Sequence, residues 1–431
     1  MFSNVARSQV AGGTRGNVSN FFPPFFLRLV WSRHRNFSQT FAKGRAAVTL
    51  SASDEDLRTA SGKLRAGGLV AFPTETVYGL GANAWNEDAI RRVFEVKGRP
   101  LSSPLIVHVP SPESAHDLLD LSSVSMPVYN FLARTFWPGP LTLIGQAHES
   151  LPLSVSAGTG MVGIRCPDSP IARRFLELAN VPVAAPSANR FGHVSPTSAD
   201  HVLEDLGDHD LYIVNGGSLP QHGARDAGRA EDRECRVGIE STVAKIDGDN
   251  EEIVLLRLGG VGKAQIEDAL RGSPFFNYSV VVRQKGEDKG SSADSFGDES
   301  PGQTLKHYAP DVPASLARFE NSHAVDSSHD PVDWEKSVVL DFGGALKALE
   351  PECLAYMDLS PSGDMDEAAN KLFGALRWSE SVPGAGHVLV SDISDEDNDH
   401  ALRDAVKDRL FRSACGRSVV INAFKSKAQL S

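Results

Sequence analysis

Residues 69–109 read LVAFPTETVYGLGANAWNEDAIRRVFEVKGRPLSSPLIVHV and contain the structural unit that recurs along the chain. The stretch begins with LVAFP (69–73), an apolar run short enough to be a buried strand. Over residues 86–97 apolar side chains recur at helical spacing, and Gly98 is a typical helix end. LIVHV (105–109) then predicts a second strand. The order strand, helix, strand is typical of an α/β sheet with helices on its faces.

The same alternation of apolar runs and helix-like stretches continues to about residue 283. Residues 53–66 begin with a Ser cap and early acids and end with basic residues before Gly67, which predicts a helix. The further strands predicted here are LTLIGQ (141–146), VGIRC (162–166), VPVAA (181–185), LYIVN (211–215), STVAKI (241–246) and EIVLLRL (252–258). Their mixed spacing predicts an open α/β sheet in a domain that covers residues 48–283.

A second, smaller α/β domain is predicted over residues 312–431. Its predicted strands are SVVLDF (337–342) and HVLV (387–390), and its predicted helices cover 364–378 and 399–415. Residues 284–311, between the two domains, begin with a long polar run without periodicity, which is typical of a linker.

The composition excludes several classes of protein. The chain has 431 residues and is 41% apolar, but no run of about 18 uninterrupted apolar residues occurs, so we predict no membrane span. Its four cysteines, Cys166, Cys235, Cys353 and Cys415, lie far apart and form no CxxC pair. This spacing argues against a zinc site and a disulfide scaffold, and it suits a reducing compartment.

The first 45 residues differ in charge from the rest of the chain. They carry seven Lys and Arg residues and no acid, and RHRNFSQ (33–39) is similar to a presequence cleavage region. Residues 1–47 are therefore predicted to be a mitochondrial or plastid transit peptide, with a disordered basic tail as the alternative. The predicted location is the mitochondrion, the cytoplasm or both, with the plastid also open. Without these cations the formal net charge falls from −12 to −19, which predicts weak or no direct nucleic-acid binding.

Three glycine-rich segments resemble phosphate-binding loops without fulfilling their requirements. GTGMVG (158–163) precedes a strand instead of opening a helix, and GLGANA (79–84) has no ribose-binding acid at the expected distance. GGVGK (259–263) lacks the first glycine of a phosphate loop and is followed by Ala264. No GxSxG or HExxH segment occurs, so the hydrolase and zinc-peptidase readings lose their support.

Two cations near the end of the first quoted helix form a candidate site. Lys97 offers a compact charge and Arg99 a planar fork, and together they suit a phosphate chain. The alternative for this pair is a solvated helix C-terminus, whose dipole favours positive charge. His108 ends the following strand and is either a ligand-binding residue or a satisfied core histidine.

Other polar residues follow predicted strands, at the place where α/β sheets usually bind ligands. Arg165 ends one strand, while Ser187 and Asn189 lie in a turn after another, and this combination suits an amino-acid carboxylate or a nucleotide. The alternative for the Ser-x-Asn segment is a simple Ser or Asx turn. Thr76 and Ser241 lie at the ends of two further strands.

Seven segments together carry a resemblance to a known family. They are PTETVYGLG (73–81), KGRPLSSPLIVH (97–108), WPGPLTL (137–143), GIRCP (163–167), PSANRFGHVSPT (186–197), GIESTV (238–243) and PGQTLKHYAP (301–310). In this order the chain resembles the L-threonylcarbamoyl-AMP synthase family. KLFGALR (371–377) and DRLFRSA (408–414) resemble the C-terminal domain of its long form. The resemblance implies a YrdC-like open, twisted, mixed sheet with flanking helices and a smaller, Rossmann-like C-terminal domain.

The resemblance implies a reaction. L-threonine, bicarbonate or CO2, and ATP give threonylcarbamoyl-AMP and pyrophosphate, with Mg2+ entering with ATP and no metal bound by the protein itself. The product passes to a separate transferase that modifies a tRNA adenosine. Fixed cations stabilise the charge that builds up on phosphate oxygens during such a transfer.

The resemblance also implies roles for individual residues. Lys97 and Arg99 are expected to be catalytic, as neutralising groups for the phosphates. The residues expected to bind threonine are Thr76, His108, Arg165, Ser187 and Ser241. Those expected to contact the nucleotide are Arg99, Ser103, Asn189, Thr197, Arg257 and Tyr308. Because Tyr308 follows the predicted linker, residues 284–311 are expected to fold over the site as a lid.

Three departures from the family pattern affect single contacts and leave the reaction intact. Ser103 stands where the family commonly has asparagine, Gln303 stands where methionine is usual, and residues 223–236 are longer and more charged than the usual loop.

Two other functions compete with the synthase. An RNA-binding YrdC-like module in ribosome maturation predicts a basic face, which the acidic composition does not favour. A carbamoyl-adenylate enzyme with another acceptor, as in hydrogenase maturation, is the second alternative. The resemblance to the long-form C-terminal domain favours threonine.

Overall fold

The computed structural model describes residues 46–217, 235–283, 300–301, 307–320, 332–393 and 400–422. The predicted transit peptide therefore lies almost wholly outside the described residues. Of the departures from the family pattern, Gln303 and most of the 223–236 loop also lie outside them. The predicted linker is described at residues 300–301 and 307–311.

An eleven-stranded sheet forms the first half of the described chain. Its order is β1-β8-β2-β3-β7-β4-β6-β5-β9-β10-β11, with parallel pairs such as β4 and β6 and antiparallel pairs such as β5 and β6. This linear, mixed order confirms the predicted open, mixed sheet. The strands are β1 (Val48–Ser51), β2 (Leu69–Phe72), β3 (Gly79–Asn83), β4 (Ile106–His108), β5 (Leu141–Gln146), β6 (Met161–Arg165), β7 (Val183–Ala184), β8 (Leu211–Asn215), β9 (Thr242–Asp247), β10 (Glu252–Arg257) and β11 (Ser279–Val282).

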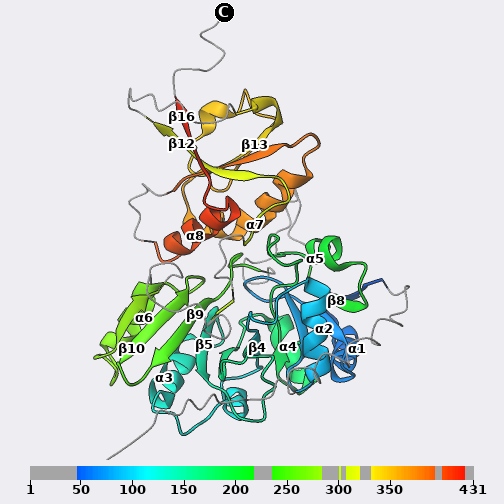
Figure 1. Cartoon of the computed structure of the whole chain (residues 1–431), viewed down its shortest axis with the longest axis vertical. Helices are drawn as coiled ribbons and strands as arrows, with labels where there is room; N and C mark the ends of the chain where they lie inside the picture. Colours follow the sequence, from blue (N-terminus) through cyan, green and yellow to red (C-terminus); the bar gives the residue numbers. More distant parts are fainter. Residues whose placement is uncertain are drawn as a thin grey trace, which may run out of the picture. The chain divides into compact units, whose positions relative to one another are not determined.

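Helices cover both faces of this sheet (Figure 1). The alternation along β2 shows it, because Leu69 and Ala71 belong to one apolar cluster, whereas Val70 and Phe72 belong to another. The first cluster includes apolar residues of α2 and α3, and the second includes those of α1 and α4. The helices of this half are α1 (Asp54–Arg65), η1 (Glu113–Leu118), α2 (Glu87–Lys97), α3 (Met126–Phe136), α4 (Pro170–Ala179), α5 (Ala199–Leu206) and α6 (Lys263–Arg271).

The ends of α1 and α2 lie where the sequence predicts them. Ser53 and Asn86 accept backbone hydrogen bonds at the two N-termini, from Asp56 and Ala89. Gly98 ends α2 with a φ of 63°, a left-handed conformation that favours glycine. The chain therefore turns sharply between Lys97 and Arg99.

Strand β3 was not predicted, because its GLGAN sequence is typical of a turn. It pairs antiparallel with both β2 and β7. A Cβ atom added at Gly81 would lie 2.8 Å from Val183 Cγ1 and 3.0 Å from Phe72 Cε1, so neighbouring side chains occupy the space above it. The glycine is in the strand because β2, β3 and β7 pack too closely for a side chain.

A second sheet has five strands in the order β14-β13-β15-β12-β16, and all its neighbouring strands are parallel. This confirms the smaller α/β fold expected for the C-terminal part. The strands are β12 (Ala314–Glu320), β13 (Ser337–Asp341), β14 (Ala355–Asp358), β15 (His387–Ser391) and β16 (Ser418–Asn422). The helices are η3 (Trp334–Lys336), η4 (Lys347–Leu349), α7 (Met365–Ser381) and α8 (Arg403–Ser413).

Helices α7 and α8 lie along one face of the five-stranded sheet (Figure 1). Their apolar residues share a cluster with the sheet residues Leu340 and Val388, and with Val77, Val194 and Ile239 from the first half of the chain. The C-terminal α/β unit, defined here as β12–β16 with its helices, therefore contacts loops of the first sheet through α7 and α8.

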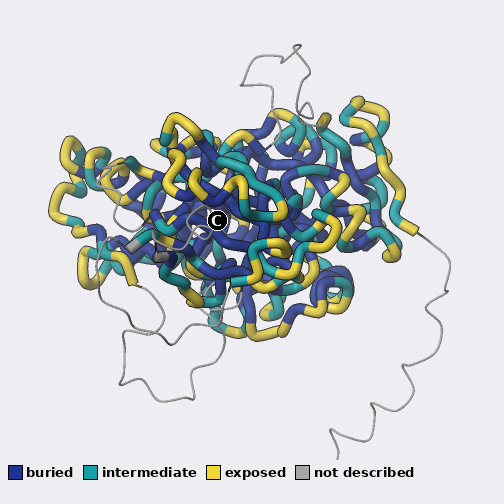
Figure 2. Tube along the Cα trace, turned by 90° about the horizontal axis from the view of Figure 1, so that it is seen from above, coloured by how far each residue is buried: buried dark blue, intermediate teal, exposed yellow. Residues whose placement is uncertain are grey.

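The central strands of both sheets are largely buried. Every residue of β2 and β13 is buried, and Figure 2 shows buried stretches enclosed by exposed loops. Within the described ranges, no helix has the length and apolar character needed to cross a membrane.

Candidate active site

A pocket lies where the predicted site residues Thr76, Arg99, Arg165 and Ser241 come together. Its described lining consists of Thr74, Thr76, Val77, Tyr78, Gly79, Arg99, Pro104, Ile106, His108, Arg165, Ala185, Pro186, Ser187, Glu240, Ser241, Arg257, Pro301 and His307. Loops after β2, α2 and β7, the segment before β9, and the ends of β4, β6 and β10 supply most of these residues. The predicted site residues among them are Thr76, Arg99, His108, Arg165, Ser187, Ser241 and Arg257.

Arg165 is held in place by two residues of the loop after β2. Its Nη1 donates to Thr76 Oγ1 at 2.8 Å, and its Nη2 lies 2.6 Å from Glu75 Oε1 in an ion pair. The side chains of Arg165 and Glu75 are 5% and 1% exposed, so solvent screens this pair little. Glu75, between Thr74 and Thr76, is a site residue for which no role was predicted.

His108 is a neutral imidazole in this site. Burial, with the nearby charge of Arg165, lowers the pKa of His108 from 6.5 to about 3. Its ring meets the edge of Phe72 with centroids 5.8 Å apart. Because its buried Nδ1 has no hydrogen-bond partner among the described residues, the ring can still bond to a ligand.

Ser241 and Arg257 form a fixed pair on another wall. Arg257 donates from Nε to the Ser241 carbonyl and from Nη2 to Ser241 Oγ, each at 3.0 Å. Thr142 Oγ1 lies 2.8 Å from the same hydroxyl. Burial lowers the pKa of Arg257, but the group stays cationic because arginine titrates far above neutral pH.

Arg99 enters the pocket from the turn after α2. Its Nη2 donates to Ser103 Oγ at 2.5 Å and to the Pro104 carbonyl at 3.0 Å. Its guanidinium carbon also lies 5.9 Å from the centroid of the Phe191 ring. Ser103 is buried but does not belong to the described lining, so here it orients Arg99.

Lys97 supports the pocket from behind. Its Nζ donates to the Ser187 carbonyl at 2.6 Å and also to the Asn189 carbonyl. Burial and the charge of Arg99 place the pKa of Lys97 well below its usual value. Lys97 thereby ties the end of α2 to the Ser-x-Asn turn, and it is not among the described lining residues.

Three other predicted nucleotide contacts also lie outside the described lining. Asn189 donates from Nδ2 to the carbonyls of Arg190 and His193, and the Thr197 amide donates to His201 Nδ1 at 3.2 Å. Tyr308 is fully buried, with a φ of 60°, next to His307, which does line the pocket. The structure therefore brings these residues close to the pocket without exposing them to it.

Several buried polar atoms around the pocket have no hydrogen-bond partner in the described part of the chain. They are Glu75 Oε2, His108 Nδ1, Asn189 Oδ1, His307 Nδ1 and Tyr308 Oη. Buried polar atoms are normally paired, so a group of unpaired ones around one pocket indicates a place for a polar ligand. Of the charged side chains in the described lining, three are arginines and one is Glu240, so an anionic ligand is favoured.

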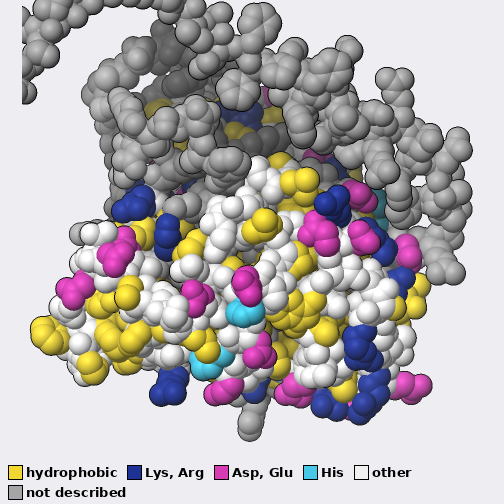
Figure 3. Space-filling model, turned by 60° about the horizontal axis from the view of Figure 1, so that its bottom comes forward, with side chains coloured by type: hydrophobic (Ala, Val, Ile, Leu, Met, Phe, Trp, Pro, Cys, Tyr) yellow, Lys and Arg dark blue, Asp and Glu magenta, His cyan; other side chains and the backbone are white. Residues whose placement is uncertain are grey.

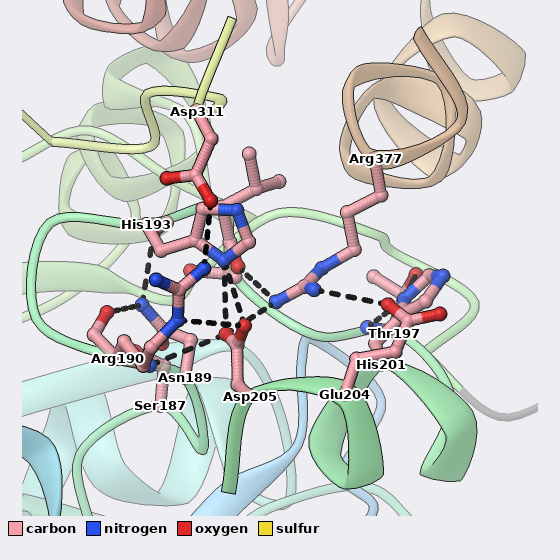
Figure 4. A network of polar contacts seen from close by, with 12 residues as sticks. Ser187, Asn189, Arg190, His193, Thr197, His201, Glu204, Asp205, Asp311 and Arg377 are labelled. Atoms are coloured by element: carbon pink, nitrogen blue, oxygen red, sulfur yellow. Dashed lines mark hydrogen bonds and ion pairs between the residues drawn. The ribbon is translucent and has the colours of Figure 1, made fainter. Parts of the chain in front are cut away.

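A network of ion pairs, the His193 network, lies beside the Ser-x-Asn turn. Figure 4 shows its members Arg190, His193, Asp205, Asp311 and Arg377. Glu380, which pairs with His193, also belongs to it. By geometry, His193, Asp311 and Glu380 could hold a metal ion. However, His193 already contacts Asp205 at 2.9 Å and Glu380 at 3.0 Å, and Asp311 pairs with Arg190 at 3.0 Å. These pairs account for the cluster without an ion.

Comparisons with known proteins agree with this architecture. A family model of the Sua5, YciO and YrdC proteins, described as telomere recombination, matches residues 62–227. A second model, described as the threonylcarbamoyl-AMP synthase C-terminal domain, matches residues 261–415. The first model covers β2 to β8 of the larger sheet, and the second covers α6 to α8 with β12 to β15 of the smaller one.

Relatives named threonylcarbamoyl-AMP synthase match most of the chain. The Pyrococcus abyssi protein is 41% identical over 370 residues, 84% of this chain and 95% of that relative. The Schizosaccharomyces pombe protein is 30% identical over 367 residues, 77% of this chain and 82% of the relative. The crystal structure of P. abyssi Sua5 complexed with L-threonine matches with a TM-score of 0.68 and 32% identity, over 88% of this chain and 100% of that one. The chain therefore belongs to the threonylcarbamoyl-AMP synthase family.

Proposed function

We propose that this protein is a nucleotidyltransferase that condenses L-threonine, bicarbonate or CO2, and ATP to threonylcarbamoyl-AMP and pyrophosphate. The observation that carries the proposal is the pocket, in which three arginines and a neutral histidine share one lining, with further unpaired buried polar atoms on the neighbouring residues Glu75, Asn189 and Tyr308. Relatives that share most of the chain bear the name of this synthase, and the P. abyssi protein has been crystallised in complex with L-threonine.

Threonine is assigned to the wall formed by Arg165, Thr76 and His108. Arg165 offers a planar fork to the carboxylate, and its contacts to Thr76 and Glu75 fix the plane of that fork. The neutral His108 can accept a proton in a hydrogen bond from the amine or the hydroxyl of the substrate. The Ser187 segment and the Ser241 hydroxyl complete this subsite.

ATP is assigned to the wall that carries Arg99 and Arg257. Both guanidinium groups line the pocket, so they can neutralise the phosphate oxygens on which charge builds up during transfer. Lys97 fixes the Ser-x-Asn turn behind the same wall through its contacts with the Ser187 and Asn189 carbonyls. The residues proposed to complete the nucleotide subsite are Ser103, Asn189, Thr197 and Tyr308.

Mg2+ is proposed to arrive with the triphosphate. The pocket offers few free oxygen ligands, because the Glu240 carboxylate accepts from Ser195 and Arg409, and Glu75 is paired with Arg165. Mg2+ commonly keeps several waters and binds substrate phosphates with few protein ligands, so these residues fit a metal–nucleotide complex. The metal would supply further neutralisation of the phosphate charge.

The charge distribution favours the enzyme over an RNA-binding module. On the face seen in Figure 3, acidic side chains lie among the basic ones. The full chain carries a formal net charge of −12, whereas a module that binds phosphate backbones needs a continuous basic surface.

The product is proposed to pass to a separate transferase that modifies tRNA, and the basic first 45 residues are proposed to direct the chain to a mitochondrion. Two fluorescent fusions test the proposed targeting. One carries residues 1–47, and in the other the seven cations of this segment are replaced by glutamine. We expect only the first to be imported into mitochondria. Equal distribution of both fusions in the cytoplasm would contradict it.

Pyrophosphate release by the full-length chain tests the synthase. We expect release that needs ATP, Mg2+, bicarbonate and threonine together, with serine as a poor substitute. Release that proceeds equally without threonine would contradict the assignment of the Arg165 wall to this amino acid.

A further inference from the structure

We propose that Arg409, on helix α8 of the C-terminal α/β unit, is a positioning residue of the synthase site that keeps the Glu240 carboxylate away from the arginines of the nucleotide wall. The inference rests on the proposed function and assigns part of the site to the C-terminal unit. Arg409 does not touch substrate in this assignment and acts through Glu240 and Tyr308.

Arg409 holds one oxygen of a carboxylate that lines the pocket. Its Nε donates to Glu240 Oε2 at 3.2 Å, and its side chain is fully buried. The other oxygen, Glu240 Oε1, accepts from Ser195 Oγ at 2.6 Å. Both oxygens of Glu240 are therefore bound, one from each half of the chain, and the orientation of the carboxylate is fixed.

Arg409 also contacts the aromatic residue of the linker. Its guanidinium carbon lies 5.4 Å from the centroid of the Tyr308 ring, a cation–π distance. The same ring stacks on Phe373 of α7, with centroids 5.3 Å apart. Tyr308, proposed for the nucleotide subsite, is thus set in place by α7 and α8.

The backbone that carries Glu240 is built against the C-terminal unit. Gly238 has a φ of 77°, and a Cβ atom added there would lie 2.4 Å from Asn370 Cα on α7. Asn370 Nδ2 donates to the carbonyls of Cys235 and Arg236, each at 3.0 Å. The contact of Arg409 with Glu240 is therefore one part of a larger wall in which α7 and α8 set the position of residues 235–241.

Electrostatics explain why this wall needs a cation at position 409. A buried carboxylate without a charged partner is costly, so it turns toward the nearest remaining cation. Glu240 and Arg257 both line the pocket, and the Glu240 charge acts on Arg257. Without Arg409, the carboxylate is expected to pair with Arg257 and to compete with the phosphates of ATP.

The test compares Arg409→Met with Lys407→Met in the full-length chain. Lys407 lies on the same helix and is exposed, and its replacement by methionine also removes one positive charge. We expect Arg409→Met to raise the KM for ATP about tenfold, with a smaller change in the KM for threonine, whereas Lys407→Met stays within about twofold. Equal KM values for ATP in both variants would overturn the inference.

A second substitution separates positioning from simple damage to packing. Because glutamine cannot pair as an anion with Arg257, Glu240→Gln added to Arg409→Met should return the KM for ATP to that of Glu240→Gln alone. If Arg409 only holds α8 in place, the increases in the KM for ATP caused by the two substitutions should multiply in the double variant, because their free energies add. Should Arg409→Met not fold, Arg409→Gln, which also removes the charge but keeps a polar side chain, replaces it, and a KM for ATP equal to that of the wild type would then overturn the inference.

Equilibrium binding of ATP to the same proteins, measured by calorimetry, keeps this inference apart from the proposed function. A wild-type chain that binds ATP without making pyrophosphate would defeat the proposed function alone. A weaker ATP affinity in Arg409→Met that Glu240→Gln restores would still support the positioning role. Unchanged affinity in Arg409→Met would overturn it.

Discussion

The pocket and the His193 network both contain buried arginines, but these arginines face different partners. Arg257, in the pocket wall, donates to the carbonyl and the hydroxyl of Ser241, which are neutral. Arg377, in the network, donates to Asp205 Oδ2 at 2.8 Å, and both of these side chains are nearly inaccessible to solvent. A buried cation set among neutral groups leaves its charge for a ligand, whereas one set against a carboxylate joins two parts of the fold.

Arg165 combines both kinds of environment, because it contacts a neutral group and a carboxylate. It donates to the hydroxyl of Thr76 and forms an ion pair with Glu75. Glu75 does not belong to the described lining of the pocket, whereas Arg165 and Thr76 do. The carboxylate therefore fixes the guanidinium from behind, and the comparison assigns Arg165 to ligand binding and Glu75 to its orientation.

The largest effect is expected at Arg165. Arg165→Met should lower kcat/KM for threonine about a thousandfold, in line with the ~4 kcal/mol typical of truncating one member of a buried charge pair. Pyrophosphate release at varied threonine measures it. The matched control is Arg190→Met, whose half-exposed side chain belongs to the His193 network, and we expect less than a fivefold change there. An equal decrease in kcat/KM for threonine in both variants would show that the arginines of the pocket and of the His193 network do not differ in function.

Lys97 is expected to show the next largest effect on activity. Lys97→Met should lower kcat about a hundredfold, because it frees the carbonyls of Ser187 and Asn189 and so releases the Ser-x-Asn turn behind the phosphate wall. Lys63→Met on α1, which breaks a partly exposed ion pair with Asp210, is the control. A Lys97→Met variant with wild-type kcat would show that Lys97 is not needed for transfer.

Arg377 is expected to affect stability more than activity. Arg377→Met should lower the free energy of unfolding by about 3 kcal/mol, because it removes the buried arginine that pairs with the Asp205 carboxylate. Among the described residues, this leaves Asp205 with His193 and the half-exposed Arg190. Denaturant unfolding measures this, and the KM for threonine should stay within about twofold. A stable variant with a much higher KM for threonine would mean that the network belongs to the threonine subsite.

The smallest effect is expected at His193 and depends on pH. Burial opposes the charged form of His193, but hydrogen bonds to Asp205 and Glu380 outweigh it, so the pKa of His193 lies above 6.5. The folded state then binds the proton more tightly than the unfolded state. The stabilisation is complete below pH 6.5 and is lost as the pH rises through the raised pKa.

His193→Gln should therefore lower the free energy of unfolding by about 1 kcal/mol at pH 6, with a smaller loss in alkaline solution. Urea unfolding of both proteins across this pH range measures the difference. The two carboxylates have other partners: Asp205 also faces Arg190 and Arg377, and Glu380 accepts from the Asp311 amide. If the difference in unfolding free energy between the two proteins does not change with pH, the effect of His193→Gln comes from packing and not from its charge.

Local signals in the sequence explain what could be predicted. The caps at Ser53 and Asn86, the left-handed Gly98 and the apolar strands are set by neighbours in the chain, and the structure has them at the expected places. The strand β3 was missed because its glycines are required by packing against Val183 and Phe72, which lie elsewhere in the sequence. The same limit applies to Arg409, whose partner Glu240 is 169 residues away.

In the site, too, the sequence indicated which residues come together but not the contacts that orient them. The family resemblance implied that Thr76, Arg99, Arg165 and Arg257 belong to one site, and all four line the pocket. Their orientation depends on side chains such as Glu75 and Ser103, whose contacts follow from the way the loops close over the sheet. Residue type and spacing can indicate a cation, but they do not show which cations are already paired with carboxylates.

The most direct test of the account is detection of the product itself. The full-length chain would be incubated with ATP, Mg2+, 13C-bicarbonate and threonine, and the adenylates would be analysed by mass spectrometry. We expect a species that contains AMP, threonine and one 13C carbon, formed by the wild type and almost absent with Arg165→Met. A folded wild-type protein that forms no such species, and instead binds RNA in a salt-sensitive way, would contradict it.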